Sequence, residues 1–174
     1  GAVLDAERRV FWVDVPHGQS GKQGNRAEAE MAKQIVADLM NWITSQPNRF
    51  ELELALVSPY VNQTQTMREM VHAHLESRGG SLRGTRGSVR LPGDKSIGVF
   101  CSTIDKFQGQ EADIVILSLR NVNRQGNIDS PNRANVALTR AREALFIVGH
   151  HQAYANARDD MLRALAEGTP LGVR

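Results

Sequence analysis

Two arginines in the last quarter of the chain have the spacing and setting of groups that bind an anion. Arg140 and Arg142 stand two residues apart in NVALTRAREALFIVG (135–149), directly before an apolar run. On a helix with 100° per residue, Arg140 lies at the edge of the apolar stripe around Ala137, whereas Arg142 lies on the other side. A guanidinium at the edge of a core can form paired, charge-assisted bonds to a phosphate. A structural ion pair with a carboxylate is the alternative for Arg140.

A second polar segment, STIDKFQGQEAD (102–113), joins two apolar runs that are typical of buried strands. It starts at the carboxyl end of the first run, and open parallel sheets bind ligands outside the carboxyl ends of their strands. Gly109 can let the backbone approach a ligand closely or adopt a positive φ. Gln108 and Glu111 flank it with groups that can hydrogen-bond hydroxyls or a ribose. The alternative is a helix start whose polar residues serve only as caps.

One segment, GQSGKQG (18–24), superficially resembles a phosphate-binding loop, but its pattern is wrong. A Walker loop has the form G-x-x-x-x-G-K-[ST]. Here Gln23 follows Gly21 and Lys22, and Pro16 occupies the place of the first glycine. The hydroxyl that would hold magnesium is missing as well. We therefore expect any phosphate that the arginines bind to be held mainly by something other than this segment.

The elements that must position these residues follow an alternating pattern. Near-continuous apolar runs, as in parallel strands buried on both faces, occur at 10–15, 54–58, 98–102, 113–119 and 145–149. Helical patterns separate or follow them at about 25–44, 62–77, from 130, and at about 153–166. Strands that alternate with helices predict an α/β fold with a parallel sheet. With 174 residues, we expect residues 1–174 to form a single domain.

The start of the first helix carries a recognisable signal. Asn25 is followed three residues later by Glu28, which is the spacing of a capping box. Apolar residues then recur every four positions on one face: Met31, Ile35, Leu39 and Ile43. We expect this helix to pack that face against the sheet.

The segment GGSLRGTRGSVRLPGDKS (79–96) departs from the alternation. It is rich in glycine and arginine, poor in acidic residues and nearly without periodicity. We expect a flexible surface loop here. The alternative is a basic flap whose arginines contact nucleic-acid phosphates and displace their counterions.

Composition narrows the classes of protein. The apolar content of 41% and the charged content of 23% are ordinary globular values. A net charge of +2 is too small to argue for nucleic-acid binding by itself. The single Cys101 cannot form an internal disulfide, which favours a reducing, cytoplasmic location. No run approaches the roughly 20 apolar residues of a membrane span, and no cluster of His, Cys and carboxylates has metal-ligand spacing, so we expect neither membrane nor metal binding.

Taken together, the two polar segments resemble motifs V and VI of superfamily 1 helicases, in the Upf-like branch. STIDKFQGQEADIVILSL is similar to motif V, with its [ST]-x-D-x-F-Q-G-x-E core, and NRANVALTRAREALFIVG is similar to motif VI, R-x-N-V-A-L-T-R-A-R. SPYVNQ (58–63) is similar to the P-Y-x-x-Q segment of that branch, and GNRAEAEMA (24–32) to its N-x-x-E-A helix start. The likeness covers about 10–149 in the family's order.

The resemblance implies a RecA-like fold of the P-loop-NTPase type, a parallel sheet flanked by helices in three α/β/α layers. It implies the second, C-terminal RecA-like domain of an ATP-dependent RNA or DNA helicase or translocase. In that family ATP lies between two domains. The first supplies the Walker loop and the acidic pair that holds Mg²⁺, and the second supplies an arginine finger. The isolated chain would then be an inactive fragment of a longer polypeptide. A non-catalytic nucleic-acid-binding or regulatory domain with the same fold is the alternative.

Carried over position by position, the resemblance implies two groups of site residues. The nucleotide group consists of the finger Arg140 and the motif V residues Gln108, Gly109 and Glu111. The strand group, near single-stranded RNA or DNA, consists of Thr103, Asp105, Pro59 and Tyr60, with Tyr60 as a candidate for stacking on a base. The implied partners are the nucleic acid and the first RecA-like domain of the same polypeptide. The family's glutamine-tyrosine-arginine motif has no counterpart in GAVLDAERR at the start of the chain.

Overall fold

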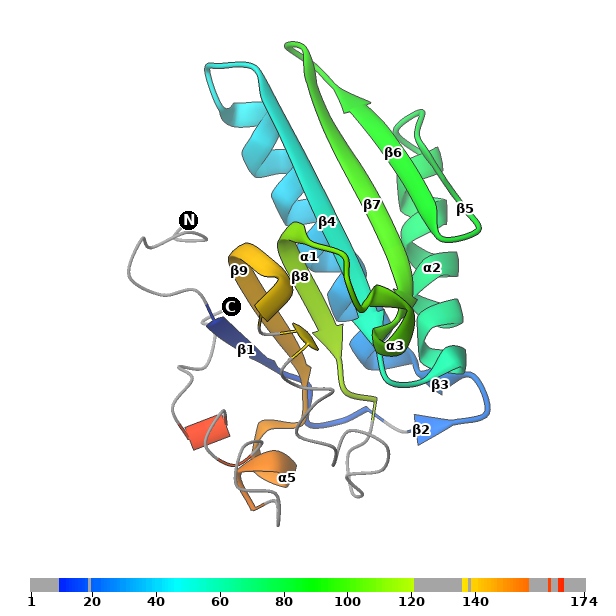
Figure 1. The fold of residues 1–174 in the computed structure, drawn as a ribbon. Coiled ribbons are helices and arrows are strands. Elements are labelled where there is room, and N and C mark those ends of the chain that lie inside the picture. The colour runs from blue at the N-terminus through cyan, green and yellow to red at the C-terminus, as the bar shows by residue number, and fades with distance from the viewer. Residues whose placement is uncertain are drawn as a thin grey trace.

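The computed structural model describes residues 10–18, 20–120, 136, 137, 139–156, 163, 166 and 167. Their main feature is a seven-stranded sheet with the order β1-β9-β8-β4-β7-β6-β5 (Figure 1). In that order, the strands are β1 (Val10–Asp14), β9 (Ala141–Gly149), β8 (Ala112–Ser118), β4 (Phe50–Ser58), β7 (Lys95–Thr103), β6 (Arg86–Leu91) and β5 (Ser81–Arg83). The first five are parallel, and β6 and β5 are antiparallel to their neighbours. This confirms the predicted parallel α/β sheet.

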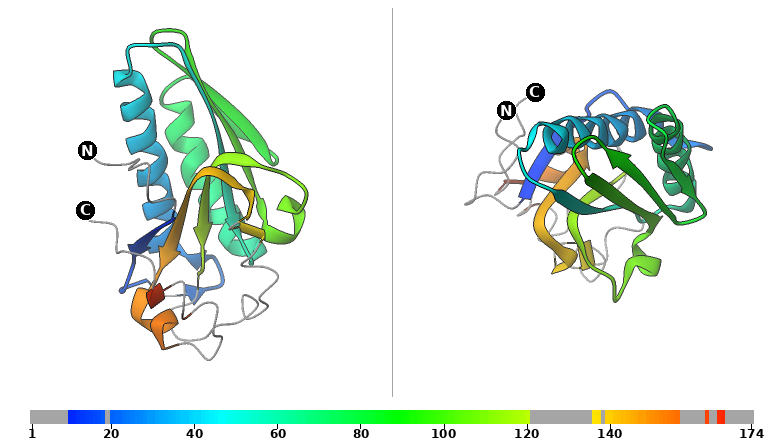
Figure 2. Two further views of the ribbon diagram at one scale, coloured as in Figure 1. Left: turned by 60° about the vertical axis from the view of Figure 1, so that its left-hand side comes forward. Right: turned by 90° about the horizontal axis from the view of Figure 1, so that it is seen from above.

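The helices lie on both faces of the sheet and make three layers. The helices whose two ends lie within the described residues are α1 (Arg26–Ser45), α2 (Val61–Glu76), α3 (Ile104–Phe107) and α5 (His151–Ala155). Helices α1 and α2 cover one face, and α3 lies on the opposite side (Figure 2). A short pair, β2 (Ser20–Gly21) and β3 (Gly24–Asn25), precedes α1. No helix in the described part of the chain is long and apolar enough to cross a membrane.

Alternation along the central strand β4 divides the core between the two faces. Leu52, Leu54 and Leu56 belong to the apolar cluster that contains α1 and α2. Ala55 and Val57 belong to the cluster on the other face, which includes residues of α3 and α5. Successive side chains of a strand point to opposite faces, so a strand buried on both sides needs apolar residues at every position. This is why the carboxyl half of β4 has no polar alternation.

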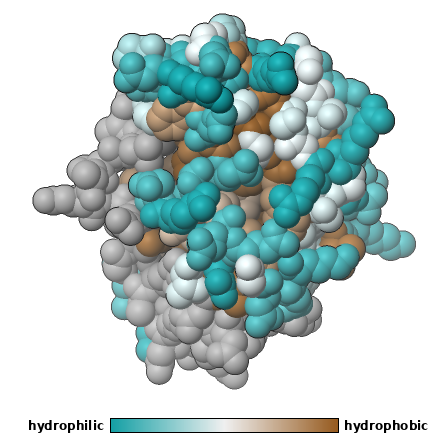
Figure 3. Space-filling view, turned by 45° about the horizontal axis from the view of Figure 1, so that its top comes forward, coloured by the Kyte–Doolittle hydropathy of each residue, from teal (hydrophilic) through white to brown (hydrophobic). Residues whose placement is uncertain are grey.

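The amino half of the same strand is open to solvent on the face opposite α1 and α2. Glu51 and Glu53 share the face of Ala55, but both are exposed. A Cβ placed on Gly98 of the neighbouring β7 would lie 2.6 Å from the Glu53 carboxylate, so Glu53 lies across that glycine. Figure 3 shows this end of the molecule tilted forward, with mostly hydrophilic side chains around a smaller apolar area. Among the described residues, the second face of β4 is therefore covered only toward the carboxyl end of the strand.

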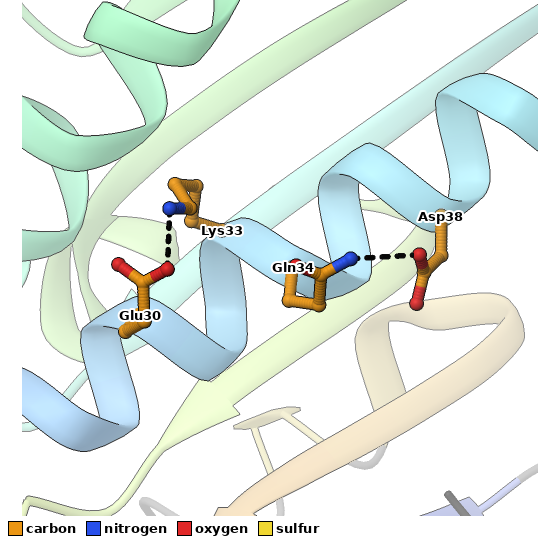
Figure 4. A network of polar contacts seen from close by, with 4 residues as sticks. All are labelled: Glu30, Lys33, Gln34 and Asp38. Atoms are coloured by element: carbon orange, nitrogen blue, oxygen red, sulfur yellow. Dashed lines mark hydrogen bonds and ion pairs between the residues drawn. The ribbon is translucent and has the colours of Figure 1, made fainter.

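Helix α1 combines an apolar inner face with a polar outer face. Its buried side includes the predicted Ile35, Leu39 and Ile43. On the outer side Lys33 pairs with Glu30, and Gln34 donates a hydrogen bond of 2.9 Å to Asp38 (Figure 4). Pairs spaced three or four residues apart support a helix only modestly, so burial of the inner face supplies most of its stability.

All five predicted strands are present, but three of them begin earlier than their apolar runs. Strands β4, β7 and β9 start three or four residues before the predicted positions. For β9 the reason is that Ala141, Arg142 and Glu143 are not buried, so they carry no apolar signal. The helical geometry assumed for Arg142 is therefore wrong, because this residue lies in a strand. Of the helix predicted from 130, residues 136, 137, 139 and 140 are described, and they are helical. Its other residues, and most of the helix predicted at 153–166, fall outside the described residues.

The prediction of a loop at 79–96 is wrong, because this segment forms β5, β6 and the start of β7. Leu82, Val89 and Leu91 are buried against the helical face of the sheet. A Cβ on Gly87 would stand 2.1 Å from the carbonyl oxygen of Ser81, so only glycine allows the two strands to approach this closely. The strands are short and their apolar residues are spaced among glycines and arginines, which hid the alternation. The basic-flap alternative stays a prediction.

Candidate functional site

The predicted site residues lie at two opposite ends of the sheet. The register pairs Ala112 of β8 with Ala141 of β9. Glu111 and Arg140, the residues just before them, therefore enter neighbouring strands side by side at their amino ends. Strand β8 has seven residues, which separates its two ends by about 20 Å. The carboxyl end of the sheet holds the strand group. Only the start of the 102–113 segment lies at that end, and ligand binding there stays a prediction.

The amino-end group centres on a buried guanidinium atom without a partner. Arg140 is half-buried, and its Nε is buried and makes no hydrogen bond within the described part of the chain. A buried donor that lacks an acceptor costs about 1–3 kcal/mol. Glu111 beside it is exposed and open to solvent. An anionic ligand could supply the hydrogen-bond acceptor that Arg140 Nε lacks among the described residues, and Glu111 would then lie beside that ligand.

The loop that leads to Glu111 presents its backbone outward. Gln108 and Gly109 are both exposed and follow α3 directly. Gly109 has φ +85°, and no atom lies within 4 Å of a Cβ placed on it. The glycine is therefore needed for its conformation, while the space in front of it is open. Of the two roles considered for Gly109, the positive φ is confirmed.

The structural ion pair that was the alternative for Arg140 is instead made by Arg142. Its Nε and Nη2 each lie 3.0 Å from Oδ1 of Asp113. The other oxygen of Asp113 accepts the backbone N–H of Glu53 at 2.8 Å. Arg142 thus ties β9 to β8 and, through Asp113, to β4, whereas Arg140 has no comparable partner among the described residues.

The carboxyl-end group lies at the ends of two neighbouring strands, β7 and β4. Thr103 ends β7 and is the N-cap residue of α3, but its side chain makes no capping hydrogen bond. Asp105 is exposed in the first turn of α3. Pro59 directly follows β4 and is buried, and its part in contacting a ligand stays a prediction. Tyr60 follows β4 and is half-buried.

The structure adds Arg120 to this edge, a residue that sequence reasoning missed. It follows the end of β8, and its guanidinium lies over the Tyr60 ring, 4.5 Å from the centroid. One face of that ring is therefore occupied by the guanidinium, and stacking of a base on Tyr60 stays a prediction. Applying the carboxyl-end rule to the apolar run 113–119 would have singled out Arg120.

A network of buried hydrogen bonds lies next to the carboxyl end of β8. Glu28 is fully buried, and its Oε2 accepts hydrogen bonds of 2.6 Å from both the Ser118 hydroxyl and the Arg120 backbone N–H. Gln63 donates to Ser118 Oγ at 2.9 Å and to the carbonyl oxygen of Asn25 at 3.0 Å. These contacts connect the starts of α1 and α2 to the end of β8.

The predicted capping box is formed only in part. Asn25 Oδ1 accepts the backbone N–H of Glu28 at 3.2 Å, as predicted. The backbone N–H of Asn25, however, donates to Gln63 Oε1 at 2.6 Å, and the Glu28 carboxylate is directed to Ser118 and Arg120. Burial raises the pKa of Glu28 to about 7, although the hydrogen bonds from Ser118 and the Arg120 backbone oppose the shift. The sequence predicted the cap at Asn25, but it did not predict that the Glu28 carboxylate is buried.

Two other kinds of reactive group in the described part of the chain were considered, a cysteine thiol and a cluster of metal ligands. The Cys101 thiol is buried, and burial raises its pKa to about 12, so it is not a nucleophile at neutral pH. Within the described ranges, no group of three or more His, Cys, Asp or Glu side chains is placed to hold a metal ion.

Comparison with known proteins gives concordant matches. The AAA domain family matches residues 2–152. DNA polymerase alpha-associated DNA helicase A of Saccharomyces cerevisiae is 27% identical over 84% of this chain and 18% of its own length. Regulator of nonsense transcripts 1 of Dictyostelium discoideum is 33% identical over 72% of this chain and 8% of its own length. The chain thus spans less than a fifth of the length of these curated relatives.

Solved structures agree with the architecture. The large terminase of a thermophilic bacteriophage superimposes on 95% of this chain and 38% of its own, with a TM-score of 0.56 and 13% identity. A second structure of that terminase, in complex with ADP, superimposes on 83% of this chain and 34% of its own, with a TM-score of 0.50 and 14% identity. At this level of identity the likeness concerns the fold alone, and it agrees with the predicted RecA-like, P-loop-NTPase-type architecture.

Proposed function

Because this chain belongs to the matched AAA domain family, as a superfamily 1 helicase domain of the Upf-like branch, we propose that it is the second RecA-like motor domain of a longer ATP-dependent helicase or translocase. Its role is to complete an ATP site whose phosphate-binding loop belongs to the first domain. The single observation that carries this proposal is the position of Glu111 and Arg140 directly before the neighbouring strands β8 and β9, with Arg140 Nε buried and unpartnered among the described residues.

Each residue of the nucleotide group has a distinct task in this proposal. Arg140 stabilises the charge on the γ-phosphate during hydrolysis, since a planar guanidinium matches phosphate oxygens with paired bonds. Gln108 and Glu111 are exposed, so their side chains can hydrogen-bond the ribose of the bound ATP. Gly109 allows the positive φ that the backbone between these two residues adopts. We assign Mg²⁺ to the first domain, because the described residues offer no cluster of metal ligands.

The strand group binds single-stranded RNA or DNA at the other end of the sheet. Thr103 offers a hydroxyl that makes no capping bond, and Asp105 lies exposed in the first turn of the helix that follows. Residues 104–111 run from this edge to the amino end of β8, about 20 Å away. The same short segment therefore adjoins both ligands, and its displacement would couple ATP hydrolysis to movement of the strand. The cytoplasmic location stays a prediction.

The proposal is tested by comparing ATP turnover of the 174-residue chain with that of the longer polypeptide that carries both RecA-like domains. Each is assayed with and without a single-stranded oligonucleotide. We expect no turnover above background from the chain alone and stimulated turnover from the longer polypeptide. Robust stimulated turnover by the chain alone would contradict the assignment to a second domain. A longer polypeptide that binds the oligonucleotide without hydrolysing ATP would favour the alternative, a binding or regulatory domain.

A further inference from the structure

The predicted strand group lacks a feature that nucleic-acid binding requires. Thr103, Asp105, Pro59 and Tyr60 carry no positive charge, yet affinity for single strands comes largely from cationic side chains that neutralise phosphates. We propose that Arg120 is the phosphate-binding residue of this edge, and that Tyr60 and the buried Glu28 hold it in place. The proposal rests on the proposed function and adds a contact that the sequence motifs did not indicate.

The topology brings Arg120 into line with the predicted residues. Strands β8, β4 and β7 are neighbours in the sheet and run in parallel. Arg120, Tyr60 and Thr103 follow or end these three strands in the same order. Because neighbouring strands lie about 4.8 Å apart, the row spans about 10 Å along the carboxyl edge. A single stretch of bound nucleic acid can therefore contact all three.

The guanidinium of Arg120 is fixed in place but keeps most of its donors. Its contact with the Tyr60 ring restrains the plane of the group. An arginine side chain has five N–H donors. In the described part of the chain, Arg120 uses one of them, from Nη2 to the Gly21 carbonyl oxygen at 3.4 Å, while its Nε is buried without a partner. A restrained fork with unused donors is suited to paired bonds to a phosphate.

Arg120 has a side chain at a position whose backbone conformation favours glycine, which indicates that the side chain has a function. Its φ is +68°, a left-handed conformation that strongly favours glycine over residues with a Cβ. Two side chains from the start of α1 hold it there. Glu28 accepts its N–H at 2.6 Å, and Asn25 Nδ2 donates to its carbonyl oxygen at 3.3 Å. Strained residues of this kind concentrate at functional sites, where the surrounding structure enforces them.

Arg120→Gly separates a binding role from a structural one. It removes the side chain, and it also relieves the backbone strain, because glycine adopts a positive φ freely. The matched control is Arg78→Ala, which removes one exposed arginine beyond the far end of α2, about 27 Å along the helix from Tyr60. Binding of fluorescein-labelled oligo-dT and oligo-U to the natural-length polypeptide is followed by anisotropy at several KCl concentrations. Thermal unfolding of each variant is measured in parallel.

For Arg120→Gly we expect about tenfold weaker binding of either oligonucleotide. The slope of log affinity against log salt should fall in magnitude by about 0.7, the value for one phosphate contact on a single strand. The unfolding temperature should equal or exceed that of the wild type. Arg78→Ala should leave all three quantities unchanged. A wild type that binds neither oligonucleotide would overturn both this inference and the proposed function.

One other outcome overturns this inference alone: the wild type binds and Arg120→Gly keeps the wild-type salt slope. If Arg120→Gly unfolds at a lower temperature than the wild type, Arg120→Lys, which keeps the charge, serves as the second variant. A wild-type salt slope in Arg120→Lys then supports the phosphate contact, and a slope reduced as in Arg120→Gly contradicts it. Loss of stability in both variants without a change of slope would assign Arg120 a structural role.

Discussion

Arg140 and Arg142 carry the same side chain two residues apart, but their surroundings give them different chemistry. Arg142 lies in β9 and is held by Asp113. Arg140 precedes the strand, and its buried Nε has no partner in the described ranges. The sequence supported an anion-binding role for Arg140 by placing it at the edge of an apolar stripe. It could not place Arg142, because the acceptor Asp113 lies on another strand, 29 positions earlier in the chain.

The pKa of Glu28 gives a prediction for stability against pH. Burial raises it from 4.5 to about 7 in the folded protein, so the folded state holds this proton more tightly than the unfolded state does. Its stabilising effect is complete below pH 4.5 and is lost as pH rises through 7. Between about pH 5 and pH 8 we expect this group to lower the free energy of unfolding by about 2 to 3 kcal/mol. Urea unfolding at both pH values measures the change.

Glu28→Gln is the matched variant for that measurement, because glutamine keeps the shape of the side chain but does not titrate in this range. The loss of stability across the same pH interval should be smaller in the variant than in the wild type by the amount given above. Equal losses in the two proteins would mean that the carboxyl group of Glu28 is not protonated in the fold near neutral pH.

At the scale of elements, the C-terminal end of α1 is held by a buried lysine of β7. Lys95 Nζ donates to the carbonyl oxygens of Thr44 and Gln46, at 2.9 and 2.5 Å. Because Lys95→Met takes the donor away from these part-buried acceptors, we expect it to lower the free energy of unfolding by about 1–2 kcal/mol. Lys33→Met on the outer face of α1 should cost less than about 0.5 kcal/mol. Chemical denaturation measures both, and equal effects would show that the cap at Lys95 contributes nothing.

The strands β5 and β6 give a second prediction at this scale. Every residue of β6 pairs with β7, and its first three residues also pair with β5. We therefore expect the hydrogen-bonded amides of β6 to exchange with deuterium as slowly as those of β7. Exchange at the rate of an unstructured peptide would restore the original expectation of a loop at 79–96.

The elements that the sequence predicted well are those with long, dense apolar runs. The apolar run 113–119 corresponds almost residue for residue to β8, since that strand is buried on both faces. Strands whose ends are exposed, such as β9 at Arg142, extend beyond their apolar signal. Short strands at an edge, such as β5, alternate over too few residues to be distinguished from a loop. Pairing partners, not local propensity, decide these cases.

At the scale of the whole molecule, the two groups of predicted site residues are separated along the strands of one sheet. The motif resemblance predicted their identities, but their separation follows only from the register and the parallel direction of β7, β4, β8 and β9. The Arg120 contact with Tyr60 joins the ends of β8 and β4, which lie 60 positions apart in sequence. Such a contact leaves no local signal in the chain.

The central claim is that Arg140 completes an ATP site in the longer polypeptide. The most direct test is nucleic-acid-stimulated ATP turnover of that polypeptide, with Arg140→Ala compared with the wild type and with Arg142→Ala. We predict that Arg140→Ala lowers kcat by about 10³-fold while oligonucleotide binding is kept. Arg142→Ala should change kcat by less than about threefold, because an exposed ion pair contributes little to stability. Small and equal effects of the two substitutions would contradict the claim and make Arg140 a structural residue.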